Sequence, residues 1–209
     1  MTSASLSTLR KFVRKPVEGE RCELCGQSLQ SEHQHMLEVA NRRLACCCDA
    51  CAILFSGRHD GRYRTVPRRI QLQADFRMSD QQWESLHLPI NLAFFYHSSP
   101  AQRVVAMFPS PAGATESQLP PDSWEQIAEA NPVLRTLQSD VEALLIYRIR
   151  KAREHYLVPI DQCYKLVGLI RSHWRGLAGG QRAWEAIDRF FAQLPELSGR
   201  GARSRPCLT

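Results

Sequence analysis

The chain has 209 residues, of which 44% are hydrophobic and 23% are charged, and a formal net charge of +6 at pH 7. Such a composition is normal for a soluble globular protein and argues against long disordered stretches. No run approaches the roughly 20 apolar residues that a membrane-spanning helix requires, and we expect no signal peptide. We therefore expect a cytoplasmic protein. Its basic residues come in four groups, within 10–15, 62–69, 148–153 and 200–205, and acidic residues are interspersed almost everywhere else, which indicates a solvated surface.

The sequence divides into four predicted parts. Residues 1–20 are a polar leader, 21–58 a cysteine-rich metal module, 59–195 an α+β domain, and 196–209 a flexible basic tail. The predicted fold class is α+β, with a treble-clef-like zinc module followed by a mixed domain that has a small antiparallel sheet and C-terminal helices. In the reducing compartment that we expect, clustered cysteines are typical of metal binding or redox chemistry, not of disulfides.

The cysteines of the module form two CxxC pairs, Cys22 with Cys25 and Cys48 with Cys51. Two such pairs at this separation are typical of a tetrahedral structural Zn²⁺ site. Gly26 follows the first pair and suits the tight turn of a zinc knuckle, because glycine tolerates a positive φ. We predict that these four thiolates are the metal ligands.

The segment between the two pairs predicts a hairpin of two strands over 34–40 and 43–47. A short helix is expected over 49–55, which places Cys51 in its first turn, where the helix dipole favours a thiolate. Knuckle, hairpin and helix together make up a treble clef.

Two further cysteines and two histidines leave the ligand set open. Cys46 shares a strand face with Cys48, so it could be an extra or substitute ligand, whereas Cys47 faces the other way as a small core residue. His35, like His33, could replace a cysteine as a ligand, or it could lie at the surface or support a ligand. The surplus thiols also keep open an alternative: an iron site or an iron–sulfur cluster in a redox protein.

The module can also be compared with HNH nucleases, which often embed catalytic histidines between two CxxC pairs. His33, His35 and Asn41 occur in the matching order. However, the segment from His35 to Asn41 leaves little room for the loop of that family, and His59 would have to serve as the later histidine. A nucleic-acid-binding or HNH-like nuclease protein is therefore a further alternative function.

After the module, residues 57–69 predict a loop, since two glycines and a proline interrupt them. Ser79 and Gln82 have the spacing of a capping box at the start of a short helix. The β-rich runs at 92–96 and 104–108 predict a hairpin, and 109–116 predict a loop of small residues.

The rest of the chain predicts helices and strands in alternation. Asp122 has cap spacing for a helix that ends before Pro132. Two strands are expected over 141–147 and 155–160, and Asp161 is then expected to cap a long helix. Its apolar positions follow the helical period: Cys163, Leu166, Val167, Ile170 and Trp174. Gly179 and Gly180 end this helix, and a last helix stops at Pro195.

No GxSxG, HExxH, Walker A or Rossmann glycine motif occurs in the sequence. Cys163 falls on the apolar face of its predicted helix, which favours a buried structural cysteine over a nucleophile. We therefore expect a protein without catalysis of its own.

The chain as a whole resembles a family of bacterial proteins that is classed only as a domain of unknown function. Its genes accompany those of uptake nickel–iron (NiFe) hydrogenases. The resemblance covers about residues 10–194 and rests on the segments 22–26, 32–35, 46–52, 91–95, 108–117, 140–144, 157–164, 173–176 and 190–191.

The resemblance implies an accessory role in the assembly, maturation or electron delivery of a hydrogenase, acting by contact with that enzyme or its maturation factors. The family pattern at the second cysteine group is CxCxxC, which implies that Cys46 is more than filler. We do not expect nucleic acid as a partner.

Overall fold

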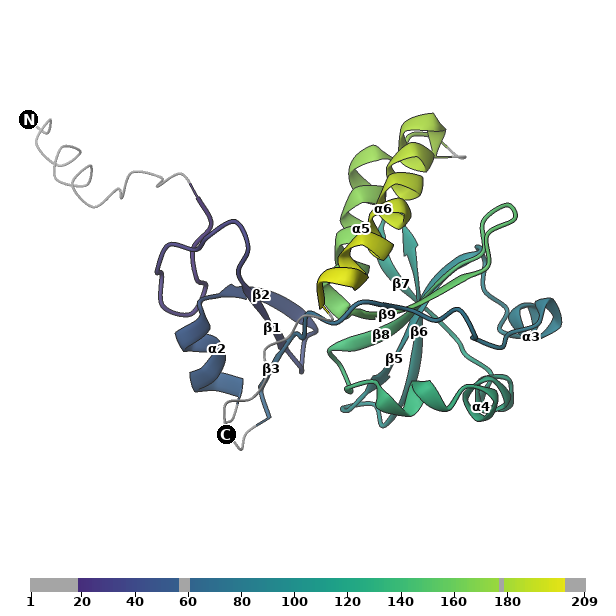
Figure 1. Cartoon of the computed structure of the whole chain (residues 1–209), viewed down its shortest axis with the longest axis horizontal. Helices are drawn as coiled ribbons and strands as arrows, with labels where there is room; N and C mark the ends of the chain where they lie inside the picture. The colour runs from purple at the N-terminus through teal and green to yellow at the C-terminus, as the bar shows by residue number, and fades with distance from the viewer. Residues whose placement is uncertain (1–18, 57–60, 177–178, 202–209) are drawn as a thin grey trace, which may run out of the picture.

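The computed structural model describes residues 19–56, 61–176 and 179–201. The leader up to residue 18, His59 and the end of the predicted tail lie outside these ranges. The described chain forms a cysteine-rich module beside a larger domain (Figure 1). The elements in chain order are β1 (Gln34–Glu38), β2 (Arg43–Cys47), α2 (Asp49–Ser56), β3 (Tyr63–Thr65), β4 (Gln71–Leu72), α3 (Asp80–Ser85), β5 (Leu92–Ser98), β6 (Arg103–Ser110), β7 (Gly113–Ser117), α4 (Pro121–Ala130), the 3-10 helix η1 (Pro132–Thr136), β8 (Glu142–Tyr147), β9 (Glu154–Pro159), α5 (Ile160–His173) and α6 (Gly180–Gly201).

The module contains a hairpin, a helix and a third strand. Within the described residues its antiparallel sheet has the order β2-β1-β3. The predicted hairpin is confirmed. Arg42 takes a left-handed φ of 56° in its turn, and the Asn41 side chain accepts a hydrogen bond from the Arg43 amide. The helix predicted after the hairpin is α2. The predicted loop over 57–69 contains β3, because Tyr63 to Thr65 pair with the open edge of β1.

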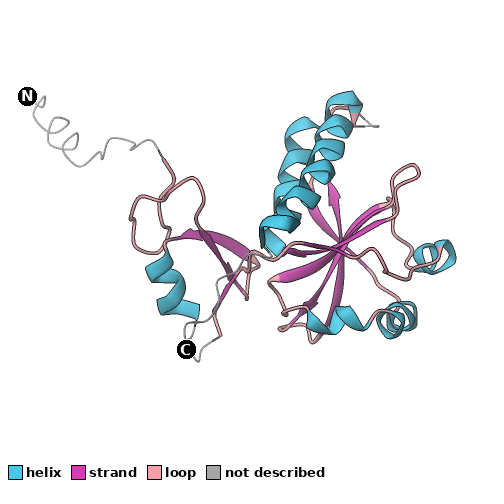
Figure 2. Cartoon of the chain, viewed as in Figure 1, coloured by secondary structure: helices cyan, strands magenta, loops and turns pink. Residues whose placement is uncertain are grey.

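The larger domain is built on an antiparallel sheet whose described strands have the order β4-β9-β8-β5-β6-β7. Because side chains alternate along a strand, Phe94 and Phe95 of β5 point to opposite faces. Phe94 packs with residues of α5 and α6, whereas Phe95 packs with Trp83 of α3 and Ile127 of α4. Figure 2 shows these helix pairs on either side of the strands. The predicted α+β class with antiparallel strands is confirmed.

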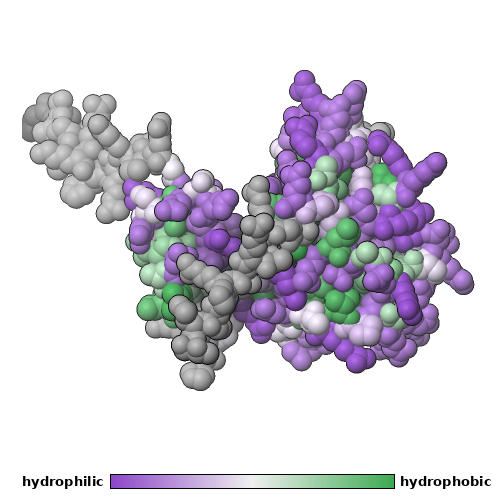
Figure 3. Space-filling model, viewed as in Figure 1, coloured by the Kyte–Doolittle hydropathy of each residue, from purple (hydrophilic) through white to green (hydrophobic). Residues whose placement is uncertain are grey.

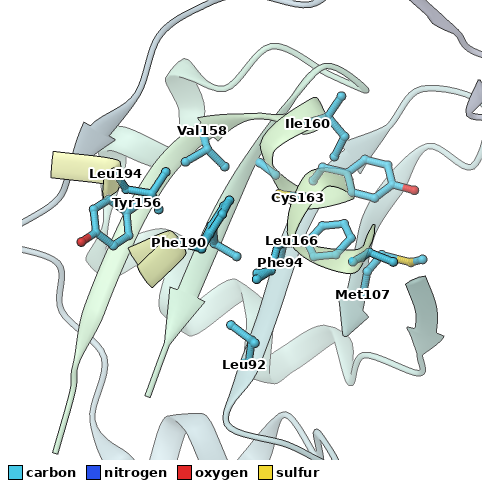
Figure 4. Close-up of a cluster of buried hydrophobic side chains, with 14 of the residues drawn as sticks. Leu92, Phe94, Met107, Tyr156, Val158, Ile160, Cys163, Leu166, Phe190 and Leu194 are labelled. Carbon is cyan, nitrogen blue, oxygen red and sulfur yellow. The ribbon is translucent and has the colours of Figure 1, made fainter. Parts of the chain in front are cut away.

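The core between the sheet and α5–α6 is densely apolar. Figure 4 shows Phe94 of β5 and Val158 of β9 facing Leu166 of α5 and Phe190 of α6. The helical stripe predicted for α5 is confirmed at its buried positions, which are Cys163, Leu166, Val167 and Ile170. This packing fixes the start of α5, which faces the module.

The sheet has more strands than predicted, because the residues of its edge strand β7 have the sequence pattern of a loop. Residues expected to form a loop over 109–116 instead end β6 and form β7, with Ser110 paired to Gly113. Gly113 has a φ of 131°, which only glycine adopts without strain, and the Ser110 hydroxyl donates to its carbonyl at 3.0 Å. Small residues thus make a tight turn here and not an open loop.

The helix ends test the capping predictions individually. The box at the start of α3 is confirmed: the Ser79 hydroxyl accepts from the Gln82 amide at 3.1 Å, and the Gln82 side chain accepts from Ser79 at 2.9 Å. The predicted Asp122 cap is wrong, because α4 already begins at Pro121, where a Pro-Pro sequence favours a helix start. The predicted Asp161 cap is also wrong; the N-cap of α5 is Pro159, and the Asp161 carboxylate bonds to His35.

The last helix does not stop at Pro195. α6 continues to Gly201, with Pro195 inside it and exposed. Leu194 is buried and Leu197 packs against the same core, so apolar packing on one face sustains the helix past the proline.

Polar contacts join the module to the domain. Arg42, at the hairpin tip, donates to the Tyr96 hydroxyl at 2.8 Å and pairs with Glu116 at 3.4 Å. Arg64 of β3 pairs with the buried carboxylate of Asp140 at 3.3 Å. These contacts set the orientation of the module against the sheet edge.

Candidate metal centres

The first candidate centre is built by a knuckle and a helix start. The Gly26 amide donates to the Cys22 carbonyl and the Cys22 amide to the Gln27 carbonyl, both at 2.8 Å. Gly26 has a φ of 78°, so this turn requires the conformational freedom of glycine. The Cys51 amide lies 3.5 Å from the Cys48 sulfur at the start of α2. The knuckle turn and the start of α2 thus hold the two cysteines of each CxxC pair in place.

The four sulfurs of Cys22, Cys25, Cys48 and Cys51 all lie within 4.8 Å of one another. Cys25 Sγ and Cys48 Sγ, which come from different pairs, are 3.7 Å apart. A tetrahedral ion with metal–sulfur bonds of about 2.3 Å would hold its thiolates about 3.8 Å apart. The four cysteines could therefore hold a metal ion, and thiolates suit zinc or iron.

The electrostatic environment of the four thiols is uneven. Burial alone would raise the pKa of the Cys22 thiol, but backbone N–H groups of Cys48, Cys25 and Leu24 lower that pKa to about 6. Burial raises the pKa of Cys51, and the neighbouring Cys48 thiol adds to the increase. Cys22 is therefore more readily ionised without metal than Cys51, whose thiolate needs a cation beside it.

Cys47 is a core residue, as predicted. It is fully buried among Met36, Cys22 and Ala52, and its thiol lies 3.4 Å from the Gln34 carbonyl. Burial raises the pKa of Cys47 to about 12. It therefore stays a neutral thiol at physiological pH.

Cys46 and His35, the two residues predicted as extra or substitute ligands, lie together in a second group. They are direct partners across β1 and β2, and His33 precedes His35 by two residues. One ring nitrogen of each histidine and the Cys46 sulfur lie within 4.8 Å of one another. Within the described residues, the chain thus brings together two groups that could each hold a metal ion.

The second group is also tied to the larger domain. His35 Nδ1 lies 2.8 Å from Asp161 Oδ2, at the start of α5. The hydrogen bond to Asp161 raises the pKa of His35, although burial opposes the increase, and the negative charge of Asp161 adds to it. Sequence reasoning missed this pair because the two residues lie 126 positions apart, and Asp161 by itself looked like a helix cap.

The surface near these groups has a hollow and an apolar patch. The hollow has a volume of about 550 Å³ and is lined in part by His33, Asp49 and Arg68. The exposed side chains of Ile53 and Leu54, with 78% and 63% of their surface accessible, lie on α2. Figure 3 shows hydrophobic residues at the surface of the module.

The chain belongs to a protein family of unknown function (DUF5947), which matches residues 21–198. The family therefore spans both the module and the domain. No curated protein and no solved structure matches the chain. No helix within the described residues is both long and apolar enough to cross a membrane.

Proposed function

We propose that Cys22, Cys25, Cys48 and Cys51 bind one structural Zn²⁺ that holds a treble-clef-like module together. The observation that carries this proposal is the convergence of four thiols within 4.8 Å from two separate CxxC pairs. A site closed by four protein ligands leaves no position for a substrate, which is typical of structural zinc.

The sulfur spacing favours a single ion over a cluster. In an iron–sulfur cluster with four cysteines the thiolates are divided over two or more iron atoms, so the four sulfurs cannot all lie as close together as around one ion. All four sulfurs lie within 4.8 Å of one another, and Cys25 Sγ lies 3.7 Å from Cys48 Sγ, which fits the single-ion geometry. The alternative is iron, in an iron–sulfur or redox protein, and elemental analysis distinguishes it from zinc.

We further propose that the protein acts in the cytoplasm through protein–protein contact and carries out no catalysis. The exposed pair Ile53 and Leu54 supports this proposal, because large apolar side chains on a helix that a metal site anchors are suited to a partner surface. The partner that the family resemblance implies is a nickel–iron hydrogenase or one of its maturation factors.

Nucleic acid fits the surface less well. Five arginines of the described segments 62–69 and 148–153 are paired with carboxylates: Arg62 with Glu38, Arg64 with Asp140, Arg69 with Glu142, and Arg148 and Arg153 with Asp80. Such pairing reduces the positive potential that phosphates would meet. A gel-shift assay at low salt tests this alternative, and retardation that weakens with added salt would favour it.

Elemental analysis of the purified full-length protein tests the metal assignment. We expect zinc, and we expect Cys22→Ser and Cys48→Ser to lose it from the four-cysteine site. Cys163→Ala is the matched control, because this cysteine is buried in the larger domain. Iron with acid-labile sulfide and a coloured protein would overturn the zinc assignment.

Pull-down from cells that express a hydrogenase tests the partner. We expect a hydrogenase or maturation subunit to be recovered with the wild-type protein and lost with Ile53→Ser/Leu54→Ser. Leu72→Ser is the matched control, since Leu72 is also exposed but lies on β4. Equal recovery by both variants would exclude α2 as the contact surface, and recovery of no such subunit would contradict the partner.

A further inference from the structure

We propose that His33, His35 and Cys46 form a second metal site, which binds an exchangeable divalent first-row transition metal through two imidazoles and one thiolate. The juxtaposition begins with strand pairing. His35 is the cross-strand partner of Cys46, and His33 directly precedes β1, where its ring comes close to both residues.

The spacing is close to that of a metal site. Bonds of about 2.0 Å to nitrogen and 2.3 Å to sulfur place the ligand atoms of a tetrahedral ion about 3.3–3.5 Å apart. The three candidate ligand atoms lie within 4.8 Å of one another, and the two imidazole rings meet edge to face with centroids 4.9 Å apart. Side-chain rotations that move the ligand atoms by about an ångström would bring them to bonding distance of one ion.

The unpartnered ring nitrogen of His33 is independent evidence that this group binds a ligand. Its side chain is only 8% exposed. Its Nδ1 lies 3.0 Å from the Gln30 carbonyl, to which it must donate, and 3.4 Å from Glu20 Oε2. The other ring nitrogen, Nε2, is buried and has no hydrogen-bond partner among the described residues. In this tautomer Nε2 carries a lone pair, which a metal ion would satisfy.

His35 has the partner that metal-bound histidines usually have. Asp161 Oδ2 lies 2.8 Å from its Nδ1 and holds the proton there, so that Nε2 presents its lone pair. A carboxylate behind a ligating histidine orients the ring and raises its basicity. The aspartate comes from α5, so metal binding at this site would tighten the contact between the module and the domain.

The second site differs from the four-cysteine site in its chemistry. Three protein ligands leave a coordination position free, as in sites where a zinc ion exchanges or binds an outside ligand. Two imidazoles and a thiolate suit zinc, cobalt, nickel or copper, whereas magnesium and calcium prefer oxygen ligands. The hollow beside His33 brings solvent to the edge of the group.

Titration of the zinc-loaded, full-length protein with Co²⁺ under anaerobic conditions tests the proposal. We expect one further metal equivalent to bind without release of the first zinc, with a thiolate-to-cobalt charge-transfer band. Cys46→Ser should abolish the band, and Cys47→Ala, one residue away on the other face, should keep it. His33→Gln should weaken binding, and Asp161→Asn should weaken it about 10-fold.

Three outcomes would overturn the second site: no additional cobalt binds at micromolar concentration, cobalt binds only as zinc is released, or the band persists in Cys46→Ser. If Cys46→Ser does not fold, the stoichiometry of the wild-type protein and of His33→Gln decides the question. Failure of the four-cysteine site is distinguishable, because it appears as missing zinc before any cobalt is added.

Discussion

Met36 and Phe94 are both fully buried, but they lie in interiors of very different kinds. Met36 lies in a small cluster whose other buried members have small side chains, and larger ones such as Leu24 and Phe55 cover it only partly; those buried members are Cys22, Cys47, Cys51 and Ala52. Phe94 lies in a large apolar core that the sheet shares with two helices. The module therefore buries too little apolar surface to stabilise about 40 residues, whereas the domain does not need a metal to do so.

The comparison assigns different sources of stability to the two regions. In the domain, burial of apolar side chains on both faces of the sheet offsets the loss of chain entropy. In the module, metal–thiolate bonds replace that burial, so folding and metal binding are coupled. Polar contacts such as Arg42 with Tyr96 link the two regions, and Leu37 of β1 also packs into the apolar core of the domain.

Removal of the metal should have the largest effect, and it should destabilise the module but not the domain. A strong chelator, or Cys22→Ser, should strip the module of stabilisation on the order of 10 kcal/mol and unfold it. Hydrogen exchange should then become fast over β1, β2 and α2, while the central strands β5 and β8 stay protected. Cys47→Ala should retain the metal and the slow exchange. A module that stays protected without metal would contradict the comparison.

A substitution in the core of the domain should have the next largest effect, and it should leave the module unchanged. Phe94→Ala should cost about 3–5 kcal/mol of domain stability, because it leaves a cavity in a fully buried position. Thermal unfolding followed by calorimetry should show this loss, and the zinc content of the folded protein should not change. Leu72→Ala, at an exposed position, should change stability by less than about 0.5 kcal/mol. Loss of zinc in Phe94→Ala would show that the regions depend on each other.

A pH dependence of similar size should arise from His155 in the domain. Burial lowers its pKa from 6.5 to about 4, and the nearby positive charge of Arg148 adds to the decrease. Below pH 6.5 the unfolded chain therefore binds a proton that the folded chain does not. Domain stability should fall by roughly 3 kcal/mol from pH 7 to pH 4 through this group.

His155→Phe should remove this part of the pH dependence, because phenylalanine can keep the stacking on Phe76, whose ring centroid lies 4.5 Å away. Hydrogen exchange of β8 and β9, measured at several pH values, reports the domain separately from the cysteine thiols. Equal pH slopes in the variant and the wild-type protein would show that His155 does not control acid stability.

The smallest effect concerns the capping box of α3. Ser79→Ala should cost about 1 kcal/mol, since it leaves the Gln82 amide without its acceptor. Urea unfolding of the domain measures this change. Gln81→Ala, in the same exposed turn, is the control and should be nearly neutral. A neutral Ser79→Ala would mean that the start of α3 does not contribute to domain stability.

Local patterns predicted much of this structure. The spacing of Cys22 and Cys25, the run of β-forming residues in β5 and the Ser79 box each depend on neighbours within a few residues. The edge strands β3 and β7 were missed, because small or polar residues gave no alternation and only their partner strands hold them in place. The sequence left Cys46 as a possible extra or substitute ligand of the four-cysteine group, and strand pairing brings it beside His35.

The pair of His35 and Asp161 could not be predicted, because neither residue has a local pattern that indicates the other. The contact exists only when the start of α5 is packed against the module. Long-range polar pairs of this kind follow from the tertiary structure, which periodicity along the sequence does not determine.

X-ray absorption at the zinc edge of a His33→Gln/His35→Gln/Cys46→Ser variant tests the central claim most directly, because only the four-cysteine group remains. We predict one zinc per chain with four sulfur neighbours at about 2.3 Å. Nitrogen or oxygen neighbours in place of sulfur, or a protein that folds with no zinc, would contradict the claim.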